Sequence, residues 1–175
     1  MQILKNSIEI FPEVQMTTSF LFKDERGFFR ETFRESKSAI SFVQDNHSFS
    51  KQGVIRGMHF QQSPGQAKWV TVLTGTIFDV VVDVRRGSPT FGTWAGVYLE
   101  ADKGDQLLIP IGFAHGFCVT SQEAHVLYKV SSYYDPSEEK TFRYDDPELK
   151  IQWPVEQAIV SRRDAQAPSF FQVFS

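Results

Sequence analysis

The sequence predicts an all-β protein, a sandwich or barrel of short strands with a few short helices. Val, Ile, Thr, Phe, Tyr and Trp supply 61 of the 175 residues, whereas Leu and Ala contribute only 8 and 9. Such a chain is rich in residues that favour strands and poor in residues that favour helices. Glycine, proline and aspartate also mark turns at short intervals, which is typical of antiparallel sandwiches and barrels.

Six runs of apolar and β-branched residues between these turns are the clearest predicted strands. In chain order they are 69–73, 77–84, 93–99, 106–109, 116–119 and 126–131. Helix is expected around 35–42 and, as a short turn, near 146–151. The chain then returns through residues 155–164 and ends in an aromatic tail. Because no linker or change of composition divides the sequence, we expect one domain over 1–175. Its parts are an N-terminal arm (about 1–45), a core (about 46–135) and a C-terminal segment (about 136–175).

Composition and charge exclude several classes of protein. The longest apolar run, 77–84, contains Asp79 and Asp83 and is far shorter than the roughly 18 residues of a membrane-spanning helix. The first residues lack a basic region followed by an apolar stretch, so we expect no signal peptide. The only cysteine, Cys118, has no partner for an internal disulfide, which favours a reducing compartment. A formal charge of −3 argues against a nucleic-acid platform. We therefore expect a cytoplasmic protein that binds neither nucleic acid nor membrane.

Two of the four histidines, His59 and His115, follow glycine-marked turns that lead into strands. A single histidine is more often a structural residue than a catalytic one, so its position alone decides little. The spacing around these two nevertheless resembles the paired motifs of the cupin superfamily, at Gly53, His59, Lys68 and Gly75 and then at Gly104, Pro110, Gly112 and His115.

In metal-binding cupins the first motif carries two histidines and a glutamate, and the second carries one more histidine. Here Gln61 stands at the second histidine and Lys68 at the glutamate. A lysine ammonium offers a metal no lone pair. The resemblance therefore implies a cupin-type jelly-roll barrel or sandwich that holds no metal, with the jelly roll formed by the core at about 46–135.

Longer blocks of sequence carry a closer resemblance, which covers nearly the whole chain. They read FKDERGFFRETF at 22–33, QDNHSFS at 44–50, GVIRGMHFQ at 53–61, FDVVVDVRRGSPTFG at 78–92, IPIGFAHGF at 109–117, LYK at 127–129, YY at 133–134, DP at 146–147 and IQWP at 151–154. In this order they resemble the dTDP-4-dehydrorhamnose 3,5-epimerase family, isomerases of deoxysugar nucleotide biosynthesis that use no cofactor.

The reaction of that family inverts C3 and C5 beside the C4 ketone of a nucleotide-linked 4-keto-6-deoxy sugar, converting dTDP-4-dehydro-6-deoxy-D-glucose to dTDP-4-dehydro-L-rhamnose. Each inversion removes a proton α to a carbonyl and returns one on the opposite face, so it needs a base, an acid and a group that stabilises the oxyanion. The resemblance implies His59 as the base, with Asp164 on its other ring nitrogen. It further implies Tyr128 as the acid and Lys68 beside the ketone oxygen.

The resemblance also implies a nucleotide-sugar site and a homodimer. Guanidinium pairs bidentately with phosphate, and Tyr134 matches a residue that stacks on the pyrimidine ring. In the family the N-terminal arm reaches the active site of the neighbouring subunit. The expected substrate-binding residues are Phe22, Arg26, Glu31, Gln44, Asn46, Arg56, Lys68, His115, Tyr134, Glu139 and Arg163.

The 25 aromatic residues exceed what one small core holds. We expect them to divide among the interior, Tyr134 and a dimer interface near Phe22, Phe28, Phe29 and Phe33.

Departures from the family pattern leave alternatives open. Met58 and Phe60 stand where Leu and Tyr are expected, and Arg163 replaces a lysine, which keeps the charge but changes its shape. The same chemistry on a GDP- or CDP-linked sugar, or a single epimerisation, therefore stays possible. A metal-dependent cupin enzyme and a non-catalytic cupin that binds a sugar nucleotide are the alternatives of other classes.

Overall fold

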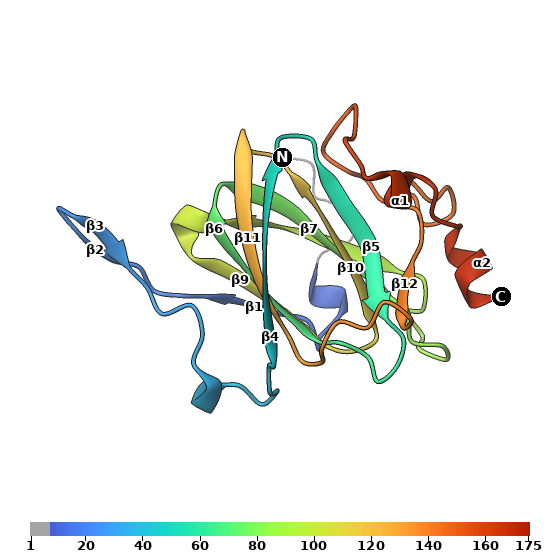
Figure 1. The fold of residues 1–175 in the computed structure, drawn as a ribbon, viewed down its shortest axis with the longest axis horizontal. Helices are drawn as coiled ribbons and strands as arrows, with labels where there is room; N and C mark the ends of the chain where they lie inside the picture. The colour runs from blue at the N-terminus through green and yellow to red at the C-terminus, as the bar shows by residue number, and fades with distance from the viewer. Residues whose placement is uncertain (1–7) are drawn as a thin grey trace.

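A computed structural model describes residues 8–175, so the expectation about a signal peptide lies outside the described residues. The predicted all-β fold is confirmed: two five-stranded antiparallel sheets pack against each other as a sandwich (Figure 1). We call the sheet of order β1-β9-β6-β11-β4 the first sheet and the sheet of order β12-β5-β10-β7-β8 the second sheet.

The first sheet contains β1 (Gln15–Thr18), β9 (Asp105–Ile109), β6 (Lys68–Thr74), β11 (Glu123–Val130) and β4 (Gln44–Lys51). The second sheet contains β12 (Glu139–Thr141), β5 (Ile55–Gln61), β10 (Phe113–Val119), β7 (Thr76–Asp83) and β8 (Trp94–Glu100). A hairpin of β2 (Phe22–Asp24) and β3 (Gly27–Phe29) stands apart from both sheets, as Figure 1 shows. The short helices are η1 (Ile8–Ile10), η2 (Glu35–Lys37), η3 (Ala101–Lys103), α1 (Arg162–Ala165) and α2 (Phe170–Phe174).

The six predicted strands are confirmed as β6 to β11, with ends that differ by at most three residues. The strand expected around His59 is β5. The strands β1, β2, β3, β4 and β12 were not among the predicted ones. Of these, β1 comes from the N-terminal arm and pairs with β9, while β12 comes from the C-terminal segment and pairs with β5.

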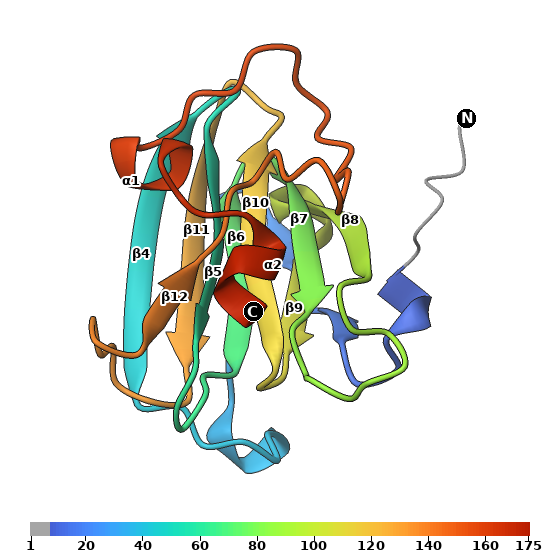
Figure 2. The same ribbon diagram turned by 90° about the vertical axis from the view of Figure 1, so that its right-hand side faces the viewer.

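Two layers of buried side chains hold the sandwich together. One fills the space between the sheets and includes Val70, Val81 and Leu107. The other lies on the outer face of the second sheet, where the C-terminal segment and α2 cover it (Figure 2). There Phe170 is fully buried and its ring lies 5.2 Å from that of Phe142. Both layers bury apolar area, the main favourable contribution to folding.

The close approach of β5 to β10 depends on glycine. Gly57 has a φ of +141°, and a Cβ placed there would lie 2.6 Å from the Cα of Gly116 on β10. Glycine alone accepts both the backbone conformation and the contact. The approach brings His59 of β5 into register directly opposite His115 of β10.

The helix predicted over 35–42 is wrong: only the 3-10 turn η2 forms there. Ser38 explains where the helix ends, because its hydroxyl donates to the carbonyl of Ile40 (2.7 Å) and accepts from the Ile40 amide (3.2 Å). Such local bonds compete with helical ones.

Near 146–151 the structure has a turn, closed by a hydrogen bond from the Lys150 amide to the Asp146 carbonyl at 2.9 Å, but no helix. Across residues 8–175, no helix is long and apolar enough to cross a membrane.

Candidate active site

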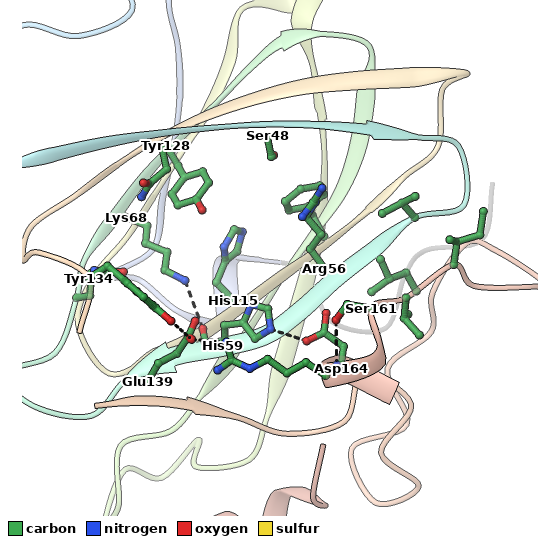
Figure 3. Close-up of a pocket in the computed structure, with 18 of the residues that line it drawn as sticks. Ser48, Arg56, His59, Lys68, His115, Tyr128, Tyr134, Glu139, Ser161 and Asp164 are labelled. Atoms are coloured by element: carbon green, nitrogen blue, oxygen red, sulfur yellow. Dashed lines mark hydrogen bonds and ion pairs between the residues drawn. The ribbon is translucent and has the colours of Figure 1, made fainter. Parts of the chain in front are cut away.

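A pocket of about 630 Å³ opens between the two sheets where β4, β6 and β11 face β5 and β10. It brings together most of the site residues that the sequence predicted: Gln44, Asn46, Arg56, His59, Lys68, His115, Tyr128, Tyr134, Glu139, Arg163 and Asp164. Figure 3 shows labelled members of this set, among them His59, Lys68 and Tyr128, converging from segments far apart in the sequence. The register explains part of this, because Tyr128 stands opposite Asn46 and Val130 stands opposite both Gln44 and Lys68.

The base expected at His59 is paired with a carboxylate. His59 Nε2 lies 2.7 Å from Asp164 Oδ1, and the Asp164 side chain is almost fully buried. Burial raises the pKa of Asp164, but the hydrogen bond and charge of His59, together with hydrogen bonds from Ser161 and the Gly57 backbone, outweigh it, so this pKa lies below its ordinary value. An ionised carboxylate only accepts hydrogen bonds, so Nε2 carries the hydrogen. The Nδ1 atom of His59 is then the basic nitrogen.

A second histidine–carboxylate pair lies beside the first. His115 Nε2 is 2.8 Å from Asp79 Oδ2, and both side chains are buried. Burial lowers the pKa of His115, and the attraction of Asp79 only partly opposes this effect. His115 is therefore a neutral imidazole at neutral pH, suited to hydrogen bonding rather than to carrying charge.

Lys68 supplies a cation inside the pocket. Its side chain is buried, and its Nζ donates to the backbone carbonyl of His59 at 3.3 Å across the two sheets. Burial lowers the pKa of Lys68 to about 8, while the charges of Glu139 and Asp79 keep it from falling further. The lysine is thus mostly protonated at neutral pH, and its charge is only weakly screened by water.

Tyr128 projects from the first sheet, opposite the sheet that carries His59 (Figure 3). Burial raises the pKa of its hydroxyl, with Arg56 lowering it and Glu139 raising it by smaller amounts. The phenol therefore keeps its proton at neutral pH. A carboxylate-paired imidazole and a protonated phenol thus line the pocket from opposite sheets.

The mouth of the pocket holds Tyr134, Glu139 and Arg163. The Tyr134 hydroxyl donates to Glu139 Oε2 at 2.8 Å, and Arg163 Nη1 lies 2.5 Å from the same oxygen. The backbone before β12 is held by Gln61, whose amide donates to the Tyr133 carbonyl (3.1 Å) and accepts from the Asp135 amide (2.8 Å). Gln61, at a metal-ligand position of other cupins, thus anchors the loop that carries Tyr134.

Three expected binding residues lie away from the pocket of their own chain. Phe22 and Arg26 belong to the exposed β2–β3 hairpin, where Arg26 is paired with Asp24. Glu31 pairs with Arg34 beside a separate groove between this segment and the first sheet. Their expected role in the site of a neighbouring subunit stays a prediction.

The sequence did not predict every residue of the site. Asp79, the partner of His115, was noted only as an interruption of an apolar strand. A buried acid in such a strand requires a partner, and that requirement is the signal that would have identified it. Ser48, Gln66, Phe117 and Ser161 also line the pocket and carried no signal of their own. Within residues 8–175, no three His, Cys, Asp or Glu side chains form a group able to hold a metal ion.

Comparisons with known proteins point to one family. The family model for dTDP-4-dehydrorhamnose 3,5-epimerase matches residues 9–172. The chain is 45% identical to the dTDP-4-dehydrorhamnose 3,5-epimerase of Pseudomonas aeruginosa over 91% of this chain and 92% of the relative. The corresponding protein of Shigella flexneri is 43% identical over 97% of this chain and 96% of its own length.

Solved structures give the same result. A dTDP-6-deoxy-D-glucose-3,5-epimerase from Legionella pneumophila, in complex with dTDP-4-keto-L-rhamnose, is 46% identical with a TM-score of 0.86, covering 90% of this chain and 87% of that one. An epimerase of Mycobacterium tuberculosis is 38% identical with a TM-score of 0.90, covering 98% and 90%. The chain belongs to the dTDP-4-dehydrorhamnose 3,5-epimerase family of isomerases.

Proposed function

We propose that this protein inverts C3 and C5 of a dTDP-linked 4-keto-6-deoxy sugar by proton transfer through an enolate. The observation that carries the proposal is the placement of a histidine–carboxylate pair on one sheet and a protonated tyrosine on the other. A sugar ring held between the sheets would present one face to each. Inversion at carbon requires this arrangement, because the proton leaves from one face and returns on the other.

In the first half of each inversion, His59 Nδ1 takes the proton from the carbon next to the ketone. The electron pair of the broken C–H bond moves into the C–C bond, and the ketone oxygen becomes an enolate. Asp164 stabilises the imidazolium that forms, and the Lys68 ammonium stabilises the oxyanion. In the second half, the Tyr128 hydroxyl gives its proton to the opposite face of the same carbon and the ketone reforms. The His59 imidazolium then releases its proton to solvent, and the tyrosinate takes one from solvent, which restores both groups.

We propose that no metal or organic cofactor takes part. Lys68 brings a positive charge to the place where a metal-binding cupin has a glutamate ligand. The side-chain amide of Gln61 is hydrogen-bonded to the backbone of Tyr133 and Asp135. A cation held near the ketone oxygen can stabilise an enolate without a Lewis acid.

The dTDP group is supported by the mouth of the pocket and by the relatives. The Legionella pneumophila structure contains dTDP-4-keto-L-rhamnose, and a Bacillus anthracis structure with 43% identity contains TDP and PPi. Arg56 and Arg163 line the pocket and suit a diphosphate. The half-exposed ring of Tyr134 suits stacking on the base.

We also propose a homodimer in the cytoplasm. The β2–β3 hairpin carries exposed aromatic rings that its own chain leaves uncovered, which favours a partner surface. Cys118 is a buried free thiol, in keeping with a reducing compartment.

Solvent exchange tests the reaction directly. Incubation with dTDP-4-keto-6-deoxyglucose in D₂O is expected to place deuterium at both C3 and C5, as NMR or mass spectrometry would detect. His59→Asn and Asp164→Asn should slow this labelling by roughly 10²-fold or more while the protein stays folded. Exchange at wild-type rate in either variant contradicts the assignment of the base.

The same assay separates the alternatives. Label at C3 alone indicates a mono-epimerase, the activity of a Streptomyces bikiniensis relative that is 33% identical with a TM-score of 0.84. No label with the dTDP sugar, but label with a GDP- or CDP-linked one, indicates another nucleotide. Activity lost to a chelator and restored by a divalent metal contradicts the metal-free mechanism. Tight binding without any exchange indicates a non-catalytic binding protein.

A further inference from the structure

Two consecutive side chains tie the four-residue helix α1 to two paired strands of the second sheet. Asp164 Oδ1 lies 2.7 Å from His59 Nε2 on β5, and Arg163 Nη1 lies 2.5 Å from Glu139 Oε2 on β12. In the β5–β12 pair, His59 stands opposite Thr141, two residues beyond Glu139. The ion pair of Arg163 and the contact of Asp164 with His59 thus hold α1 against the same pair of strands.

The same Glu139 oxygen also fixes the ring of Tyr134. The Tyr134 hydroxyl donates to Glu139 Oε2 at 2.8 Å, and its backbone amide donates to Gln44 Oε1 at 3.1 Å (Figure 3). One carboxylate oxygen thus accepts a bond from the ring expected to stack on the nucleotide base. It also receives the guanidinium of the helix that carries Asp164.

Arg163 is the cation that pairs directly with Glu139. The Glu139 side chain is only 14% exposed, and it lines a pocket proposed to take a diphosphate. An unpaired carboxylate at such depth would be poorly solvated and would repel an anion. Arg163, half exposed, neutralises it from the rim. A planar guanidinium presents several donors in fixed directions, which allows it to order Glu139 as well as balance its charge.

We propose that Arg163 is a positioning residue that, through Glu139, links the nucleotide-stacking ring of Tyr134 to the Asp164–His59 pair. Stacking of the nucleotide base on Tyr134 and alignment of His59, the proton acceptor, then depend on one contact network. The inference rests on the proposed function for what the pocket binds, but the contacts themselves are independent of it. This positioning role differs from a role in which Arg163 only binds a phosphate of the substrate.

Kinetics distinguish the two roles of Arg163. In a positioning role, Arg163→Met and Glu139→Gln each lower kcat by on the order of fivefold, the scale of a coupled contact, and the double variant is no worse than the more severe single one. Arg163→Lys, which retains a cation for Glu139, recovers most of kcat.

In a purely phosphate-binding role, Arg163→Met raises KM and leaves kcat unchanged, and Glu139→Gln frees the arginine to bind phosphate and lowers KM. Arg162→Met, next to it on the exposed side of α1, is the matched control and should leave both constants unchanged.

A measurement without substrate keeps this test separate from the proposed function. The imidazole Nε2 proton of His59, hydrogen-bonded to a carboxylate, should give a downfield NMR resonance in the wild type. Arg163→Met and Glu139→Gln should shift or broaden it, and Arg162→Met should not. An unchanged resonance together with wild-type kcat in both variants overturns the positioning role. A wild-type enzyme with this resonance but no exchange of label overturns the proposed function instead.

Discussion

At the scale of single residues, the site depends on a buried charge that the fold must tolerate. Lys68 projects from a strand of the first sheet into the sandwich, and its pKa falls from the ordinary 10.5 to about 8 because burial disfavours the ammonium. That lowering corresponds to about 3 kcal/mol between the folded and unfolded states. The protein thus carries a destabilising group at the position where the proposed reaction needs a cation.

We therefore predict that activity falls as the pH rises through about 8, because Lys68 loses the charge that stabilises the enolate. Lys68→Met should lower kcat by about 10²-fold or more at pH 7. The same change should raise the free energy of unfolding by about 1–2 kcal/mol, since it removes the buried charge but leaves the His59 carbonyl without its donor. Turnover against pH and urea denaturation measure both effects.

The size of the stability effect of Lys68→Met also depends on pH. Below about 8 the folded wild type carries the full cost of the ammonium, and between about 8 and 10.5 it sheds the proton that the unfolded chain keeps. The advantage of Lys68→Met should therefore shrink over that range. Lys103→Met, at an exposed lysine paired with Glu100, is the control and should change stability by less than about 0.5 kcal/mol. A Lys68→Met protein that is less stable than the wild type at pH 7 contradicts this account.

Much of the site could be predicted from the sequence, but through family resemblance rather than through the residues alone. His59, Tyr128 and Lys68 carry unremarkable local patterns, and only the order of the blocks brought them together. Asp79 was not predicted as a site residue because the valines around it do not reveal which side chain will contact its carboxylate. Its partner, His115, lies 36 residues away and meets it through the pairing of β7 with β10.

At the scale of elements, β4 and β12 are strands that the sequence did not indicate and that contribute side chains to the pocket. In β4 the inward residues Gln44, Asn46 and Ser48 are polar because they line the site, so the strand lacks the alternation of apolar and polar residues that reveals a half-buried strand. The predicted helix at 35–42 failed for the opposite reason: its pattern was suitable, but Phe42 packs on Trp69 of the first sheet and Ser38 bonds to the backbone.

The contact between β5 and β10 gives a prediction at this scale. Gly57→Ala should lower the free energy of unfolding by about 2–3 kcal/mol, because the new methyl would meet the Gly116 Cα at 2.6 Å and the His115 carbonyl at 3.2 Å. The two strands must separate to relieve the contact, which moves His59 away from its register with His115. We therefore expect activity to fall together with stability, as denaturation and turnover would show.

Gly87→Ala separates the steric contact from backbone strain. Gly87 also has a positive φ, +89°, but a Cβ there meets nothing within 4 Å. Its substitution should cost only the strain of the left-handed conformation, about 1 kcal/mol, and leave activity intact. If both variants lose the same stability, the close approach of β5 to β10 does not explain the need for Gly57.

At the scale of the whole molecule, the many aromatic rings divide between a buried set and an exposed set. Phe60, Phe142 and Phe170 pack beneath the C-terminal segment, and Phe33 packs on the first sheet against Trp69. By contrast, Phe20 is 71% exposed and Phe29 is 70% exposed, at the hairpin that projects from the sandwich in Figure 1. A projecting apolar hairpin is typical of a segment that packs on another subunit.

We predict that the wild type is a dimer by light scattering and that the double change Phe22→Ser, Phe29→Ser shifts it toward monomer and lowers activity. Phe171→Ser, at a similarly exposed ring near the C-terminus, should change neither the dimer nor the activity.

If the arm completes the site of its neighbour, Arg26→Ala and Asp164→Asn damage different halves of a shared site. Each variant alone should then be nearly inactive, and mixing them after partial unfolding should restore about a quarter of the wild-type activity, because half of the dimers are mixed and each mixed dimer has one intact site. A monomeric wild type, or mixing that restores nothing, would show that the arm serves only its own chain.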